Sequence, residues 1–271
     1  MTTREIFLSC WRIDPLALLL GGAAVVAYVM SQRGRMNGRA VAFAAAIVLF
    51  SLALVSPIGV LSDGYLFSAH MLQHLLLVLV VPPLVLLGLA PITDRAQNKV
   101  SRAILRPLVT WGLGVSAMWL WHAPTLCNAA ASSALMHRVQ EASLLAMGTA
   151  FWLPIVGPNA SARMKPLSGV VYLFTACTAC TVLGIMVTFS PVEVCSVFRH
   201  PVDRLGVMPL IREGWGLTAE KDQQVGGLFM WVPACLVYGA GILGLLARWY
   251  RADQDPAPAS TPTTAPLPEA S

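Results

Sequence analysis

Charged residues are scarce in this sequence. Asp, Glu, Lys and Arg make up 11% of its 271 residues, whereas soluble domains carry about 25%. Hydrophobic residues make up 56%, and the mean hydropathy is positive, at +0.68. This composition excludes an ordinary soluble domain and predicts an all-α, polytopic integral membrane protein.

Other features are also missing. The sequence has no basic run with interleaved aromatic residues, so we expect no nucleic-acid partner. Six cysteines in a chain of this size do not form a disulfide scaffold, although a disulfide among Cys10, Cys127 and Cys195 stays open. The first 15 residues lack a signal-peptide pattern, and no internal repeat is visible.

Apolar segments recur along the chain, and seven of them approach the length that a membrane-spanning helix needs, about 20 residues. These predicted spans cover residues 15–30, 40–56, 65–89, 107–121, 135–156, 167–189 and 225–250. Pro15 is typical of a helix start, and Pro82-Pro83 predicts a kink in the third span. The predicted organisation is an outer N-terminal segment at 1–14, a membrane domain at 15–251, and a disordered, Pro- and Ala-rich cytoplasmic tail at 252–271.

Lysine and arginine are distributed unequally between alternate connections. Eleven of the 18 basic residues fall in the first, third and fifth connections and in the C-terminal flank. Cytoplasmic loops carry such an excess. The asymmetry predicts an outside N-terminus and a cytoplasmic C-terminus, with the long loop at 190–224 on the outer side.

The histidines are concentrated toward the predicted outer side. His70 and His74 stand one helical turn apart on one face of the third span, above a stretch from Leu75 to Leu89 that has no charge. Ionisable groups within membrane segments are rare and usually functional. His122 ends the fourth span at the outer surface, and His137 begins the fifth.

The seventh span adds Asp222 and Met230 at the same depth. Imidazole and thioether ligands suit copper, Cu(I) in particular, and a carboxylate with imidazoles would also take zinc or iron. The predicted metal ligands are therefore His70, His74, His122, His137, Asp222 and Met230.

Each of these residues also has a structural interpretation. His122 could be an interfacial cap, His137 with Glu141 a surface pair, Asp222 a helix N-cap, and Met230 a packing residue. Cys177 and Cys180, three residues apart within a span, are typical of helix packing, with a metal role as the alternative.

Several of these motifs together resemble the CtaG-type cytochrome c oxidase assembly factor family. The motifs are His70-Met-Leu-Gln-His74, Pro82-Pro83, Leu87-Gly88, Trp121-His122-Ala-Pro124, His137 to Glu141, Phe151-Trp152-Leu-Pro154, and Asp222-Gln223-Gln224-Val-Gly226-Gly227-Leu-Phe-Met230-Trp231. The resemblance implies a non-enzymatic protein of the bacterial inner membrane that handles copper for a haem–copper oxidase. The implied partners are oxidase subunits, membrane lipid and other copper chaperones.

The chain departs from the family pattern at two positions. Ala142 stands where the family often has a histidine, and Cys127 stands where it often has a tyrosine. The first departure removes a possible ligand from the fifth span, whereas Cys127 could supply a soft one. Two competing functions stay open: a haem-binding redox protein with axial histidines, and a metal-free assembly scaffold.

Overall fold

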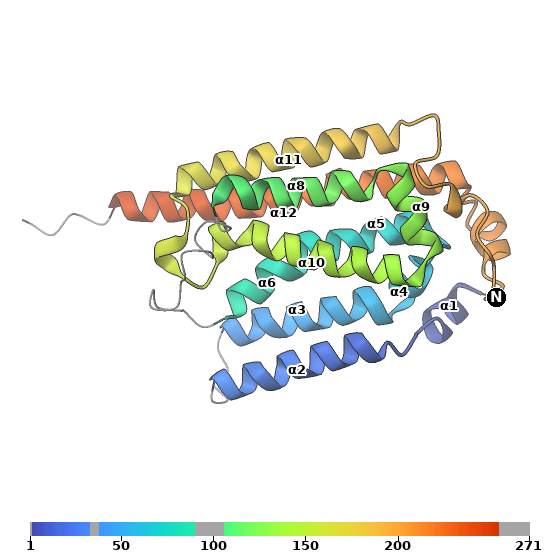
Figure 1. The fold of residues 1–271 in the computed structure, drawn as a ribbon, viewed down its shortest axis with the longest axis horizontal. Coiled ribbons are helices and arrows are strands. Elements are labelled where there is room, and N and C mark those ends of the chain that lie inside the picture. The colour runs from blue at the N-terminus through green and yellow to red at the C-terminus, as the bar shows by residue number, and fades with distance from the viewer. Residues whose placement is uncertain (1, 33–37, 90–105, 255–271) are drawn as a thin grey trace, which may run out of the picture.

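The structure is a computed structural model that describes residues 2–32, 38–89 and 106–254. Within these ranges every regular element is a helix and no strand occurs, which confirms the all-α prediction. The main helices lie side by side along one direction, as Figure 1 shows. They are α2 (Pro15–Gln32), α3 (Gly38–Val55), α8 (Pro107–Trp121), α10 (Ala134–Val156), α11 (Pro166–Thr188) and α12 (Ala219–Gln254), together with the broken helix α5–η1–α6.

Five helical segments are long and apolar enough to cross a membrane. They are Gly38–Leu61, Phe67–Gly88, Ala134–Val156, Pro166–Thr188 and Ala219–Gln254. The apolar part of α2, Pro15–Met30, is shorter, and α8 has 15 residues. The structure therefore supports a membrane protein, and the number of spans and their orientation stay predictions.

The third predicted span is interrupted in its middle. It consists of α5 (Phe67–Leu75), a π-helical segment η1 (Leu76–Val80) and α6 (Val81–Gly88). Pro82 and Pro83 stand in the first turn of α6, where a missing backbone N–H costs least. The widened turn before them absorbs the change in hydrogen-bond register, so the break lies just ahead of the predicted kink.

Glycines allow other helices to approach this broken helix closely. A Cβ at Gly148 of α10 would overlap the main chain at Val78, and one at Gly226 of α12 would overlap the Phe67 ring. A Cβ at Gly227 would overlap Thr188 of α11, so these two neighbouring glycines let α12 pack closely against both α5 and α11.

One end of the helical bundle is covered by short elements, and we call it the capped end (Figure 1). These are α1 (Thr3–Ser9), α4 (Pro57–Leu61), α9 (Pro124–Ser132), and the loop after α11 with η4 (Ser196–Phe198) and η5 (Leu210–Gly214). A disulfide between Cys127 and Cys195 joins α9 to this loop. A small apolar cluster joins α1 and α4 to η5, with Ile6, Leu61 and Ile211 among its members.

The opposite end of the bundle carries the connection from α10 to α11, with η3 (Ala160–Ala162), and the last turns of α12. α12 continues as a helix to Gln254, so positions 252–254 of the predicted tail are helical. The rest of that tail, 255–271, lies outside the described residues.

Candidate functional site

Four of the five histidines converge near the capped end. The ring centroids of His70 and His74 lie 4.2 Å apart, as their one-turn spacing on α5 predicts. His137 from α10 lies 5.4 Å from His70, and His122 from the end of α8 lies 5.8 Å from His74. His200 is exposed and stands apart in the loop after η4. The structure therefore brings together the four histidines that the sequence selected.

The inner imidazoles have free nitrogen atoms. His70 and His74 are almost fully buried, at 0% and 1% exposure. Nδ1 of His70 lies 3.2 Å from the carbonyl oxygen of Ser62, while its Nε2 has no hydrogen-bond partner among the described residues. Neither ring nitrogen of His74 has such a partner. A buried polar atom without a partner costs about 1–3 kcal/mol, so these nitrogens destabilise the fold unless a ligand binds them.

His122 is buried at the end of α8 rather than exposed there. α9 follows α8 almost directly and folds across the capped end. Nδ1 of His122 bonds the Met118 carbonyl, and its Nε2 lies 3.1 Å from the sulfur of Met71. Met71 comes from α5, between the two histidines of that helix, and it was missed as a candidate although it belongs to the same motif.

His137 lies 3.8 Å from Glu141, measured from Nε2 to Oε1, but this pair is buried rather than at the surface and belongs to a larger polar network. Its Nδ1 lies 2.9 Å from Oδ1 of Asp63, and its Nε2 lies 3.2 Å from Oε1 of Gln73. Gln73 donates from Nε2 to Glu141 at 3.0 Å, and Glu141 accepts from Arg138 at 2.9 Å. Both ring nitrogens of His137 are thus bonded to other side chains, which makes it a weaker ligand candidate than His70 and His74.

Asp63 connects this network to the surface, since its side chain is 43% exposed. Arg12 donates to its other oxygen at 2.7 Å. Although partial burial opposes ionisation, the hydrogen bond and charge of His137 and the charge of Arg12 lower the pKa of Asp63 to about 2. Asp63 is therefore ionised at any physiological pH.

Asp222 caps another helix. Its Oδ2 accepts from the backbone N–H of Phe67 at 2.8 Å, and its Oδ1 accepts from the backbone N–H and the hydroxyl of Ser68 at 3.0 and 2.6 Å. The sequence pattern suggested a cap on its own helix, whereas the carboxylate reaches across from α12 to the start of α5. These bonds occupy the carboxylate, so Asp222 positions the histidine helix.

Gln223, the next residue, fixes the loop that follows α11. Its Oε1 accepts from the backbone N–H of Val194, and its Nε2 donates to the Val187 and Val192 carbonyls. Met230 packs in the main apolar core at 2% exposure. The motif that starts at Asp222 therefore has a structural role at its first two positions.

Two further residues belong to the site and had no signal in the sequence. Phe198 of η4 places its ring 5.4 Å from that of His70, so the loop covers the histidines from outside. Gln140 on α10 is fully buried, and its side-chain amide lies beside His74 at the limit of hydrogen bonding, without forming a hydrogen bond of regular geometry. Long-range folding of the loop places Phe198, and no local pattern indicates it.

The arrangement is not a finished metal site. Within the described ranges, no group of three or more His, Cys, Asp and Glu side chains is positioned to hold a metal ion. Cys127 is in the disulfide with Cys195 and so offers no thiolate in this state. The sulfur atoms of Cys177 and Cys235 approach to 3.2 Å between α11 and α12, a helix contact away from the histidines. The atoms that remain free to bind a metal ion are Nε2 of His70 and the ring nitrogens of His74, with Met71 and His122 beside them.

Two hollows open at the capped end. One of about 680 Å³ is lined by Arg12, Asp63, Tyr65, Ser133 and Arg204 among others, and it reaches the carboxylate that holds His137. We call it the Asp63 hollow.

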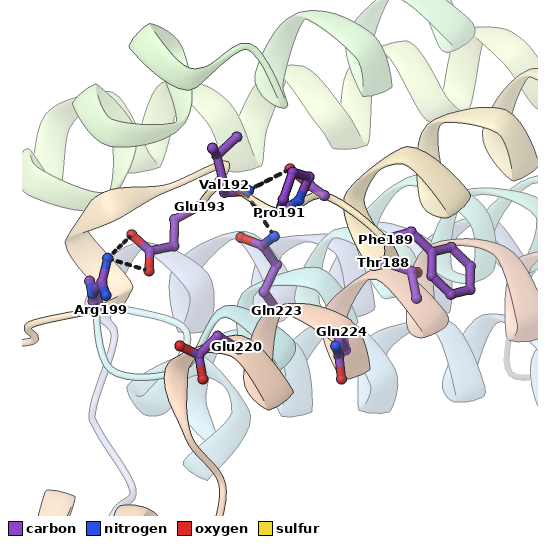
Figure 2. Close-up of a pocket in the computed structure, with 10 residues that line it drawn as sticks. Thr188, Phe189, Pro191, Val192, Glu193, Arg199, Glu220, Gln223 and Gln224 are labelled. Carbon is purple, nitrogen blue, oxygen red and sulfur yellow. Dashed lines mark hydrogen bonds and ion pairs between the residues drawn. The ribbon is translucent and has the colours of Figure 1, made fainter.

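The second hollow, of about 510 Å³, lies between the end of α11 and the start of α12. Figure 2 shows the Glu193–Arg199 ion pair on one side of it and Glu220 and Gln224 on the other. We call it the Glu220 hollow, and its lining is largely polar.

Comparisons with known proteins agree with the motifs. The family model described as cytochrome c oxidase caa3 assembly factor matches residues 23–252. An uncharacterised protein of Mycobacterium leprae is 25% identical over 278 residues, which cover 91% of this chain and 40% of that protein. One from Mycobacterium bovis is 23% identical over 277 residues, with the same coverage. The chain thus spans about two fifths of the length of these relatives, and no solved structure matches it. The chain belongs to the caa3-type cytochrome c oxidase assembly factor family.

Proposed function

We propose that this protein binds Cu(I) as cargo at His70 and His74 and delivers it to a subunit of a haem–copper oxidase. The observation that carries the proposal is the set of three free ring nitrogens on these two buried imidazoles. Imidazole and thioether are ligands that hold Cu(I), and Met71 with His122 adds both beside the pair. The proposed ligand set is therefore His70 and His74, with His122 and Met71 completing it on small side-chain movements.

An incomplete site fits delivery better than storage. Structural metal sites are closed by four protein ligands, whereas a donor must release its ion. His122 Nε2 lies 3.1 Å from the Met71 sulfur. Both groups would have to separate in order to bind copper. Their mutual contact would therefore compete with the ion and favour its release.

The proposed orientation places the capped end outside. The excess of lysine and arginine in the other connections supports an outside N-terminus, seven spans and a cytoplasmic C-terminus in a bacterial inner membrane. The Asp63 hollow would then face the periplasm. The Glu220 hollow, with its polar lining, would be the contact for an oxidase subunit or another copper chaperone.

Two alternatives lead to different measurements. A bis-histidine haem must fit between its two axial rings, and the centroid distances of 4.2 and 5.8 Å leave little room for a porphyrin. In a metal-free scaffold the histidines would serve packing alone. Replacing one of them with an apolar residue should then leave metal and haem binding unchanged.

The test is Cu(I) binding by His74→Leu, measured anaerobically on purified protein in competition with a chromophoric chelator. Leucine fills a similar volume without polar atoms, so we expect at least tenfold weaker binding together with an equal or higher thermal unfolding temperature. His200→Ala removes an exposed histidine and should change neither quantity. Unchanged Cu(I) affinity in His74→Leu would reject ligation, and a haem absorption spectrum in the purified parent would favour the haem alternative.

A further inference from the structure

An apolar groove lies at the end of the bundle opposite the histidines. It encloses about 630 Å³ between α6, α10 and α12, within the range of roughly 300–1,000 Å³ typical of ligand sites. Its walls are mainly apolar, with Leu84 and Leu87 from α6, Trp152 from α10 and Leu236 from α12. Two arginines, Arg163 and Arg248, complete the lining, and we call it the arginine groove.

The groove has free room on its α12 side. Apart from its chain neighbours and the backbone of α12, no atom of the described residues lies within 4 Å of the position that a Cβ would take at Gly244, which lines the groove. A larger side chain there would enter open space without displacing the protein's own atoms. Gly239, on the same helix, also has open space at its Cβ position but does not line the groove.

The two arginines have no acidic partner. Arg163 donates from Nε to the Gly157 carbonyl at 2.7 Å, and Arg248 donates to the Ile155 and Met164 carbonyls at 3.4 Å each. No ion pair joins either guanidinium to a carboxylate in the part of the chain that the structure describes. Both are thus held by neutral carbonyl groups, and their charge is not compensated.

The guanidinium groups are also close enough to repel one another. Burial, the charge of Arg248 and that of Arg39 lower the pKa of Arg163. Like charges held together without a carboxylate stabilise an anion between them, and a guanidinium matches the planar, bidentate recognition of phosphate.

We propose that the arginine groove binds an anionic phospholipid, with an acyl chain along the apolar walls and the phosphate between Arg163 and Arg248. A phospholipid is complementary to the groove. Its acyl chains match the apolar walls, and its phosphate carries the charge opposite to that of the two arginines. Basic pockets between membrane helices on the cytoplasmic side bind acidic headgroups. This inference is independent of copper, since the groove and the histidines lie at opposite ends of the bundle.

The test compares phosphatidylglycerol with phosphatidylcholine on delipidated, detergent-purified full-length protein. Lipid retention is measured by native mass spectrometry. We expect phosphatidylglycerol to bind at least tenfold tighter, and each of Arg163→Gln and Arg248→Gln to weaken it about tenfold. Arg251→Gln removes an exposed charge from the same end of α12 and should have little effect. Equal binding of the two lipids, or full retention by the double arginine variant, would overturn the proposal.

A second variant tests the acyl chain alone. Gly244→Leu should fill the groove and weaken phosphatidylglycerol binding with both arginines intact, whereas Gly239→Leu should not. Phosphatidylglycerol with brominated acyl chains should quench the fluorescence of Trp152, measured as the difference from Trp152→Phe because the chain has 8 tryptophans. Quenching that is equal in parent and Gly244→Leu, with equal retention, would show that the chain lies elsewhere and would reject the site.

Discussion

The free nitrogens of His70 and His74 are costly at the scale of single residues. No described residue forms a hydrogen bond with these nitrogens, although both side chains are packed into the bundle at 0% and 1% exposure. By contrast His137, in the same cluster, has a partner for each nitrogen. Within the cluster, His137 is therefore held in place by two hydrogen bonds, whereas His70 and His74 keep ring nitrogens that are available to a ligand.

Asp63 is the residue whose charge stabilises this positioning network. A native pKa of about 2, against 3.8 for the free side chain, corresponds to roughly 2 kcal/mol before solvent screening. Because the side chain is 43% exposed, solvent screens its ion pairs and lowers their contribution to stability to about 1 kcal/mol. A lowered native pKa means that this stability is complete above about pH 4 and is lost as pH falls toward 2.

Asp63→Asn should therefore lower the free energy of unfolding by about 1 kcal/mol at pH 7 and by about half as much at pH 3. The measurement is thermal or denaturant unfolding of both proteins in detergent at the two pH values. Glu213→Gln is the control, because Glu213 is an exposed acid of η5 that forms no ion pair with the described residues, and it should change little at either pH. A loss at pH 3 as large as that at pH 7 would show that the Asp63 charge does not contribute.

At the scale of elements, the position of α5 depends on α12. Phe67 and Ser68 are the first residues of α5, whose backbone N–H groups have no partner inside the helix. Asp222 satisfies both, and the negative charge also interacts favourably with the positive end of the helix dipole. The cap is buried at 0% exposure, so water cannot replace it.

Asp222→Ala should lower stability by about 3 kcal/mol, because it leaves two backbone N–H groups and the Ser68 hydroxyl without partners. Asp222→Asn keeps one acceptor oxygen and should lose about half as much. Gln224→Ala, two residues along on an exposed position, is the control. The thermal unfolding temperature of each variant in detergent gives the order, and Asp222→Ala unfolding together with the parent would contradict the capping role.

Sequence patterns predict the helices well because each helix is defined by local properties. The predicted span at 107–121 coincides with α8, and Pro15 and Pro166 begin their helices as proline does at a first turn. The one-turn spacing of His70 and His74 also predicts their contact. These features depend on periodicity and on single residues, which the sequence displays directly.

The rest of the site depends on which distant segments meet. Asp63, Gln73 and Glu141 form one network across three elements, and the loop after α11 places Phe198 on His70. The sequence shows that His122 ends a helix, but only the fold of α9 shows that it is buried. Asp222 was predicted as a ligand, with a helix cap as the alternative, and no local pattern indicates that its carboxylate caps a helix far away in the sequence.

At the scale of the whole molecule, the first prediction concerns orientation. Ser132, at the end of α9, and Ala162, in η3, lie at opposite ends of the bundle, and both are exposed. In intact cells, a membrane-impermeant maleimide should label Ser132→Cys but not Ala162→Cys, which should react only after lysis. The protein without either added cysteine is the control for its free native thiols. Labelling of both positions in intact cells would reject the proposed arrangement of spans.

The last prediction concerns what the cell loses without the protein. All four clustered histidines lie toward the capped end, so an ion bound there would be held on the side where an oxidase subunit could accept it. A copper donor should therefore be needed for metallation and not for synthesis of the oxidase polypeptides. In membranes from a deletion strain, oxidase subunits should be present with low copper content and low activity, and added copper should restore part of both. His74→Leu should resemble the deletion, because the folded protein remains while its ligand is lost, whereas His200→Ala should restore full copper content. Restoration by His74→Leu equal to that by His200→Ala would mean that the protein acts as a scaffold, and the delivery mechanism would then be wrong even if the protein is needed for assembly.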